Sequence, residues 1–401
     1  MKSLNLLIVT LILIFPALAL SAQESTPEAT TEPTPEGWPI VERCITESTI
    51  LDVGDEWPFE GSIFTTSEQG VRALHADIGI PYFVAFNNFE QFTDAGAVSP
   101  DGTMFALPGG TVDKCSNMMC DDYYFFNEIR VYSTDPNPES LNTIEWNDRM
   151  AFFGGVAGAS QYPLNWLEEE ILSNYWRIQS TTREETNSYL TKINVISGEI
   201  SPLNVGIPDI QELEVSFDQT RIVVRQSDPI TQMATWSIYS LENINLLSLL
   251  SMPNQQFRGV LSWLPDSSGF LGAIRYVSEN GEPIREETAL FSRDGLYNEQ
   301  VTPFIISDYR PLNRQTFDIN SAQMAFLLYD TERRDQILYL ADLSRHQITN
   351  TCLAASSLAL SPTGQEIAFT GDNFISILDI EDEKIHVIPY EVGSIISWRE
   401  G

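Results

Sequence analysis

Basic residues are scarce in this sequence. Lysine and arginine together number 22 against 56 aspartates and glutamates, and the formal net charge is −34. The only lysines are Lys2, Lys114, Lys192 and Lys384. Because nucleic-acid binding needs clustered cations that neutralise phosphates, this function class is excluded, and anionic membrane surfaces are disfavoured for the same reason. A strongly acidic surface instead suits solubility outside the cell, divalent cations or basic partners.

Catalytic and metal-binding patterns are also absent. The three histidines, His75, His346 and His386, have no metal-ligand spacing to one another or to a cysteine. No glycine-rich phosphate-binding loop and no EF-hand loop occurs. The segment most similar to a hydrolase nucleophile elbow, 158–162, lacks the final glycine. We therefore assign no catalytic, cofactor-binding or metal-binding residue from the sequence.

The many acids do not form a recognisable site. The runs Glu168–Glu170 and Glu381–Glu383 are interpreted as solvated faces. Asp121 and Asp122 are the only candidate for a Ca²⁺ ion, and two adjacent carboxylates carry little information. Paired carboxylates for glycosidase chemistry stay open as an alternative, because the sequence does not reveal the distances between acids.

Long apolar runs are missing outside the N-terminus. Lys2 precedes an apolar core, Leu4–Phe15, and small residues follow up to Ala22. This pattern predicts a cleaved signal peptide over residues 1–22, since the core is short for a membrane span of about 20 residues. An uncleaved membrane anchor is the alternative. No cysteine follows the core, so a lipobox is absent, and we expect a secreted, extracellular or cell-envelope protein without stable membrane insertion.

Residues 23–39 contain mainly proline, threonine and glutamate. Such a segment cannot bury apolar surface, so it is predicted to be a disordered linker. Residues 40–401 are predicted to form one domain.

A turn-and-strand pattern recurs along this domain. Its clearest copies are Ser99-Pro100-Asp101-Gly102 and Ser361-Pro362-Thr363-Gly364, each followed by a short apolar strand. Proline presets φ in the turn, and glycine supplies the positive φ that ends it. The copies begin near residues 99, 167, 216, 264, 318, 361 and 398. Most intervals match the roughly 40–50 residues of one four-stranded propeller blade.

This pattern resembles the TolB-like and PD40 (WD40-like) β-propeller repeats of secreted bacterial proteins. The resemblance covers residues from about 95 to the C-terminus and implies an all-β fold of four-stranded antiparallel blades. The last copy stops at Gly401, and a lone edge strand there is unfavourable. We therefore expect strands at 62–66, 70–74 and 82–86 to complete a closing blade shared by both chain ends. Seven blades are predicted; six or eight are the alternatives.

Two segments complicate the pattern. Apolar residues at helical spacing in 163–178 permit an amphipathic helix, but the composition near Tyr175 and Trp176 favours a strand. The longest interval, 68 residues, predicts a loop or an extra hairpin at 137–162. The longest candidate binding loops are 108–124, 137–162 and 179–187.

Four cysteines fit an exported protein. Cys115 and Cys120 flank four residues and could close a small loop. Cys44 and Cys352 are distant in sequence, but a ring that joins its ends brings them together, so a disulfide between them could clasp the closure. All three pairings remain open. A Cys-x4-Cys metal site is the rival, and it lacks a nearby histidine.

The sequence favours a non-catalytic binding scaffold that uses loops on one face of the propeller and the mouth of its central channel. The expected partner is a protein or a glycan, with no nucleic acid, no cofactor and a monomeric state. The alternative is an extracellular hydrolase or lyase that acts on polysaccharide or peptide through carboxylates at the channel mouth.

Overall fold

The computed structural model describes residues 37–52, 55–67, 69–86, 96–113, 123–137, 139–152, 164–178, 186–203, 210–227, 234–250, 255–278, 280–306, 317–320, 323–371 and 374–400. Glu36–Gly401 form one compact unit. The described residues form β-strands and turns, and they include no helix. Accordingly, this part of the chain contains no helix that could cross a membrane.

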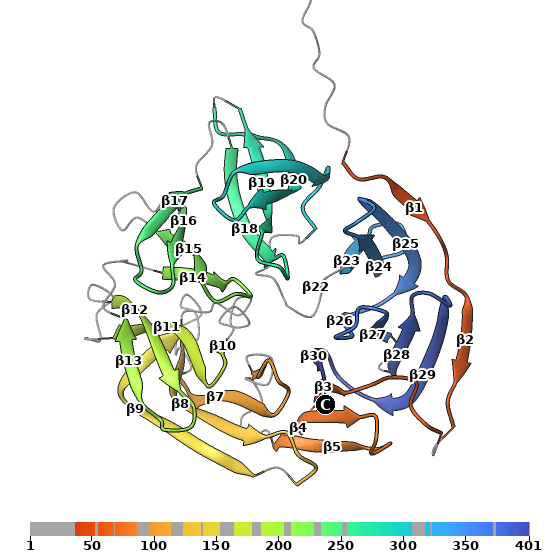
Figure 1. Cartoon of the computed structure of the whole chain (residues 1–401), viewed down its shortest axis with the longest axis horizontal. Coiled ribbons are helices and arrows are strands. Elements are labelled where there is room, and N and C mark those ends of the chain that lie inside the picture. The colour runs from red at the N-terminus through yellow and green to blue at the C-terminus, as the bar shows by residue number, and fades with distance from the viewer. Residues whose placement is uncertain are drawn as a thin grey trace, which may run out of the picture. The chain divides into compact units, whose positions relative to one another are not determined.

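The strands form seven antiparallel blades of four strands each, and blades 2 and 3 join edge to edge into one eight-stranded sheet. The blades are numbered here in ring order and listed from inner to outer strand (Figure 1). Blade 1 is β30 (Ile395–Arg399), β3 (Ser62–Ser67), β4 (Gly70–His75) and β5 (Pro81–Phe86). Blade 2 is β6 (Ala97–Val98), β7 (Met104–Asp113), β8 (Tyr123–Ser133) and β9 (Ser140–Phe152). Blade 3 is β10 (Asn165–Leu167), β11 (Glu170–Ile178), β12 (Thr186–Asn194) and β13 (Ile200–Leu203). Blade 4 is β14 (Ile210–Val215), β15 (Arg221–Ser227), β16 (Ala234–Ser240) and β17 (Leu246–Leu249).

The remaining blades repeat this plan. Blade 5 is β18 (Gln255–Trp263), β19 (Gly269–Val277), β20 (Pro283–Ser292) and β21 (Tyr297–Thr302). Blade 6 is β22 (Phe317–Ile319), β23 (Gln323–Asp330), β24 (Asp335–Asp342) and β25 (Gln347–Ala354). Blade 7 is β26 (Ser357–Leu360), β27 (Glu366–Gly371), β28 (Phe374–Asp379) and β29 (Lys384–Glu391). The predicted all-β propeller of seven blades is therefore confirmed.

Both ends of the chain contribute to blade 1, as the unfinished last repeat predicted. The C-terminal strand β30 pairs with β3, and Trp398 lies opposite Ile63. Both side chains are buried and belong to the apolar cluster between blades 7 and 1. The Trp398 indole donates a hydrogen bond of 2.8 Å to the Glu60 carbonyl. The C-terminal strand is thus an inner strand of the ring and not an exposed edge.

Packing between blades closes the ring. The described residues form seven apolar clusters of buried side chains, and each cluster combines side chains from two neighbouring blades. The cluster between blades 4 and 5, for example, contains Trp236, Trp263 and Phe291. Since these clusters alternate with blades around the whole circuit, no single interface carries the fold.

An N-terminal strap, residues 37–52, runs along the outer edges of three blades and was not predicted. The Trp38 amide donates 2.9 Å to the Val301 carbonyl on the outer strand of blade 5. Next, β1 (Ile40–Glu42) pairs in parallel with β25, and β2 (Glu47–Ile50) pairs in parallel with β29. Figure 1 shows both strands on the outside of blades 6 and 7. Trp38 packs between blades 5 and 6, so ordered packing begins slightly before the predicted boundary at residue 40.

A disulfide between Cys44 and Cys352 ties this strap to the end of β25, across 308 residues of sequence. The sequence suggested this pairing, because closure of the ring brings the two cysteines together. Cys115 and Cys120 lie outside the described residues.

The repeated turn is built as its sequence suggests. In blade 2, the Ser99 hydroxyl donates 2.6 Å to Asp101 and accepts 2.9 Å from the Met104 amide, and Gly102 has φ 75°. Blade 4 has the same bonds between Ser216, Asp218 and Arg221, and Gln219 takes the glycine position with φ 53°. The degenerate copy in blade 4 therefore keeps the turn geometry, although a residue other than glycine takes the left-handed position.

The observed strands test two predictions, the strand at 163–178 and the loops at 108–124 and 137–162. The 163–178 region forms β10 and β11, so the strand interpretation is confirmed over the helix. The predicted loops at 108–124 and 137–162 are partly wrong, because β7 runs to Asp113 and β9 covers Ser140–Phe152. Residues 153–163, the rest of the predicted insertion, lie outside the described residues. Most of the third candidate loop, 179–185, lies outside the described residues.

Candidate functional site

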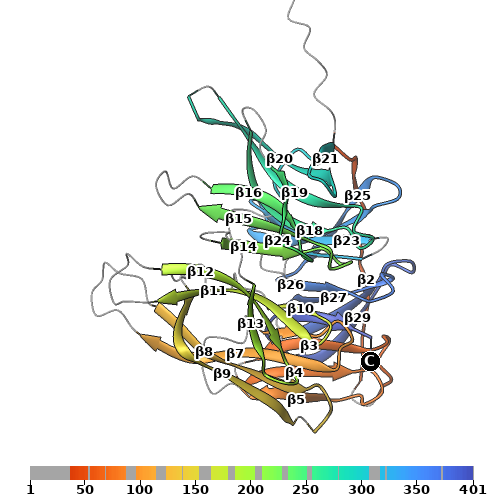
Figure 2. The ribbon, with the colours of Figure 1, turned by 60° about the vertical axis from the view of Figure 1, so that its left-hand side comes forward.

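In blades 2 to 7, one end of each blade carries the turns between its first and second strands and between its third and fourth strands. We call this end the turn face. Blades 3 and 4 lie side by side in the ring, and β11 and β12 contact β14 (Figure 2). Between their turns lies a cavity of about 750 Å³, which we call the acidic groove. Its lining residues are Leu167, Glu168, Glu169, Glu170, Lys192, Asn194, Gln219, Thr220, Ser240, Leu241 and Glu242.

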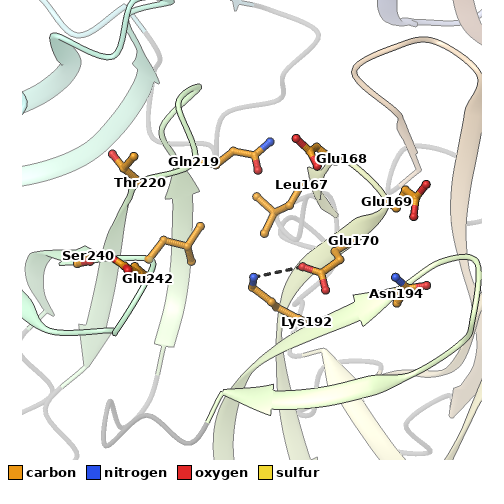
Figure 3. Close-up of a pocket in the computed structure, with 11 residues that line it drawn as sticks. Leu167, Glu168, Glu169, Glu170, Lys192, Asn194, Gln219, Thr220, Ser240 and Glu242 are labelled. Atoms are coloured by element: carbon orange, nitrogen blue, oxygen red, sulfur yellow. Dashed lines mark ion pairs between the residues drawn. The ribbon is translucent and has the colours of Figure 1, made fainter.

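Blade 3 supplies most of the charge. Glu168 and Glu169 form the tight turn between β10 and β11, and Glu168 has φ 52°. Glu170 begins β11 and accepts an ion pair of 3.2 Å from Lys192 on the neighbouring strand β12. Figure 3 shows this pair across the groove from Glu242. Three glutamates and one internally neutralised glutamate therefore converge on one cavity, with a single lysine among the lining residues.

The floor of the groove is apolar and fixed. Leu167 and Leu241 are buried and belong to the cluster that packs blade 3 against blade 4. The walls are formed mainly by turns that connect regular strands. The arrangement combines an apolar base with acidic walls, which suits a ligand that has both apolar and cationic groups.

Ion pairs with blade 5 fix the blade 4 side of the groove. Arg293 of blade 5 donates 3.2 Å to Asp218 and 3.0 Å to the Thr220 hydroxyl. Arg221 of blade 4 in turn pairs with Asp294 and donates 2.7 Å to the Arg293 carbonyl. Burial alone would raise the pKa of Asp218, but hydrogen bonds from Ser216 and Thr220 and the charge of Arg293 lower it below its usual value. Asp218 is therefore a structural anion of the turn.

A smaller cavity of about 220 Å³ lies between blades 5 and 6. It is lined mainly by apolar side chains and is closed by Trp38, whose ring stacks on His346 with centroids 4.8 Å apart. The strap thus fills part of this interface with its own indole, and the cavity is smaller than the roughly 300–1,000 Å³ typical of ligand sites.

The sequence candidates do not meet in the groove. His75 accepts a hydrogen bond from the Asp77 amide, and His346 stacks on Trp38. His386 lies on β29, where burial and then Lys384 lower its pKa. Residues 114–122, with Asp121 and Asp122, and residues 158–162 lie outside the described residues. Of the two acidic runs interpreted as solvated faces, Glu168–Glu170 lines the groove.

Metal-ligand geometry is limited to one place in the described part of the chain. Glu42, Cys44 and Cys352 place potential ligand atoms within 4.8 Å of one another. Both sulfurs there are joined in the disulfide, so they are not available as thiolate ligands.

No protein-family model matches the chain, and no curated protein matches it in sequence. Solved structures match it in shape. TolB from Acinetobacter baumannii is 12% identical, with a TM-score of 0.39 over 84% of this chain and 81% of that one. The C-terminal WD40 domain of Sif2 is 12% identical, with a TM-score of 0.44 over 89% and 92%.

A functionally unknown protein from Desulfotomaculum acetoxidans is 9% identical, with a TM-score of 0.47 over 84% of this chain and 98% of that one. The strand order, the repeated turn and the shared closing blade carry the fold assignment independently of these scores. The chain is a seven-bladed β-propeller.

Proposed function

We propose that the protein is a secreted, non-catalytic binding scaffold that recognises a basic segment of a protein partner in the acidic groove. The observation that carries this proposal is the convergence of four glutamates on one cavity of about 750 Å³. This volume lies within the range of about 300–1,000 Å³ that is usual for ligand sites. Secretion is proposed from the N-terminal signal pattern, and N-terminal sequencing of protein from the culture medium tests it.

Charge favours a protein partner over a glycan. Three of the four glutamates have no cation among the residues that line the groove, so an arginine or lysine side chain would gain attraction there. None of the lining residues is aromatic, and the groove therefore offers no ring on which a sugar can stack. Its leucine floor adds a place for an apolar side chain next to the cation.

Fluorescence anisotropy with a labelled alternating arginine–leucine peptide tests the proposal. An alternating glutamate–leucine peptide is the matched probe. The variant Glu168→Gln/Glu169→Gln/Glu242→Gln removes three charges from the groove. The control variant Glu381→Gln/Asp382→Asn/Glu391→Gln removes three charges from blade 7. We expect the groove variant to weaken binding of the basic peptide by roughly tenfold or more, with little change for the control.

Salt provides a second readout. Binding at the groove should weaken as ionic strength rises, because the acidic walls are open to solvent. Lys192→Met removes the one lysine of the groove and should tighten binding of the basic peptide. Equal affinities for the groove variant and the control variant contradict the proposal. Turnover of a polysaccharide or a peptide that the groove variant abolishes would support the hydrolase or lyase alternative.

A further inference from the structure

The outer strand of blade 4 presents an apolar edge. In β17, Leu246, Leu247 and Leu249 are 52%, 46% and 60% exposed. The inner side of β17 pairs with β16, where Leu249 lies opposite Ser237. No strand in the described part of the chain pairs with its other side. Outward backbone groups and leucine side chains therefore face solvent together, which makes β17 a template for a further strand.

Two other outer strands of the propeller pair with an added strand. The outer strands of blades 6 and 7, β25 and β29, each hold a fifth strand, supplied by the strap. The outer strand of blade 2 is a useful contrast. In β9, Leu141 is 48% exposed, but the exposed Glu145 follows it, and the end of β9 pairs with β11. Among the outer strands that the structure describes, β17 combines a free edge with three large exposed apolar side chains.

The absence of charge near β17 favours a second copy of the chain as the partner of this edge. No ionisable side chain occurs from Asn243 to Phe257, although the chain as a whole carries a net charge of −34. Two copies of such an anion repel one another wherever acids face each other. An uncharged apolar edge is the surface where this repulsion is smallest. A basic partner gains nothing from this edge, whereas an identical edge matches it in both polarity and length.

We propose that two copies of the chain associate through β17 in antiparallel pairing about a two-fold axis. An axis through Ser248 places Leu247 of each copy opposite Leu249 of the other, so both exposed leucines gain an apolar cross-strand neighbour. Pairing of two four-residue strands buries far less than the roughly 1,200–2,000 Å² of a stable interface. The dimer is therefore weak and dependent on concentration, in place of the monomer that the sequence suggests.

Sedimentation equilibrium of the full purified protein, from about 1 to about 200 µM, tests the proposal. We expect the average mass to rise with concentration toward twice the chain mass. Raising NaCl from about 20 to about 500 mM should strengthen association, because salt screens repulsion between the two anions. Leu249→Glu places like charges within the paired edge and should raise the dissociation constant roughly tenfold or more. Leu141→Glu, on the outer strand of blade 2, is the matched control and should leave it unchanged.

Two results would overturn this inference. A wild-type protein that keeps the monomer mass at the highest concentration and salt leaves no role for the edge. Equal loss of association in Leu249→Glu and Leu141→Glu points to a general charge effect. Both substituted leucines are exposed, so circular dichroism should give the same melting curve for wild type and variants. The salt response has the opposite sign to that of peptide binding in the acidic groove, and this separates the two proposals.

Discussion

Blades 6 and 7 and blades 3 and 4 share one four-stranded plan, yet their surfaces differ. The outer edges of blades 6 and 7 are covered by β1 and β2, and the Cys44–Cys352 disulfide fixes the strap between them. Blades 3 and 4 have no such cover among the described residues; they enclose the acidic groove and end in the open strand β17. The strap and the disulfide therefore reinforce the blades near the joined chain ends, whereas the groove and the open strand edge lie on blades 3 and 4.

Carboxylates behave differently in the two regions as well. In the groove, Glu168 and Glu169 are exposed and stay hydrated. Near the closure, Glu366 lies opposite Asp379 on the next strand of blade 7. Burial, and then the charges of Asp379 and Glu60, raise the pKa of Glu366 to about 7. An acid at the closure therefore opposes folding at neutral pH, whereas the acids of the groove remain free to meet a ligand.

Loss of the C-terminal strand should have the largest effect. Ending the chain after Ser394 removes β30 and the buried Trp398, which packs between blades 7 and 1. Removing one buried tryptophan side chain alone costs about 3–5 kcal/mol, and here the inner strand of a blade is lost with it. We expect thermal melting by circular dichroism to lose its cooperative transition. Removing only Glu400 and Gly401 is the control, and an unchanged melting curve for the longer deletion would refute the shared blade.

Loss of the disulfide should rank second. Cys44→Ser/Cys352→Ser removes a cross-link that spans 308 residues, and such a link stabilises mainly by constraining the unfolded chain. The expected loss is about 2–5 kcal/mol, measured by guanidinium unfolding.

Arg43 lies in the strap, next to Cys44 in the sequence, so limited trypsin digestion offers a local readout. We expect cleavage after Arg43 to become faster in the serine variant. Cleavage after Arg345, in a turn of blade 6, should keep its rate. Equal rates at Arg43 in both proteins would mean that the strap stays in place without its cross-link.

Glu366→Gln should give the smallest change and a clear pH dependence. The folded-state pKa lies above the usual value of 4.5, so native Glu366 holds its proton over a window in which the unfolded chain has lost it. This contribution to stability is full below pH 4.5 and is lost as the pH rises toward about 7. The glutamine variant should therefore be more stable than wild type at pH 8, by on the order of 1 kcal/mol for this half-buried group. Near pH 4 the advantage should vanish. Glu381→Gln, in an exposed turn, is the control, and a pH-independent difference for Glu366→Gln contradicts this account.

The sequence predicts the parts of the fold that depend on local chemistry. Serine and aspartate at fixed offsets set the first turn of blades 2 and 4, and the unfinished copy at Trp398 indicates how the ring closes. The strap strands β1 and β2 carry no such signal, because they are short, exposed and paired in parallel with residues 300 or more positions away. The acidic groove was missed for a similar reason. Glu168–Glu170 has the composition of a solvated face, and only packing beside Gln219 and Glu242 of blade 4 makes it the wall of a cavity.

Hydrogen–deuterium exchange with and without the arginine–leucine peptide tests the central claim most directly. If the groove binds basic segments, the peptide should slow exchange at residues 167–170, 192–194, 219–220 and 240–242. Exchange in the strap, at residues 40–50, should stay unchanged. Protection confined to the strap or spread evenly over all blades, with none at the groove, would contradict the account.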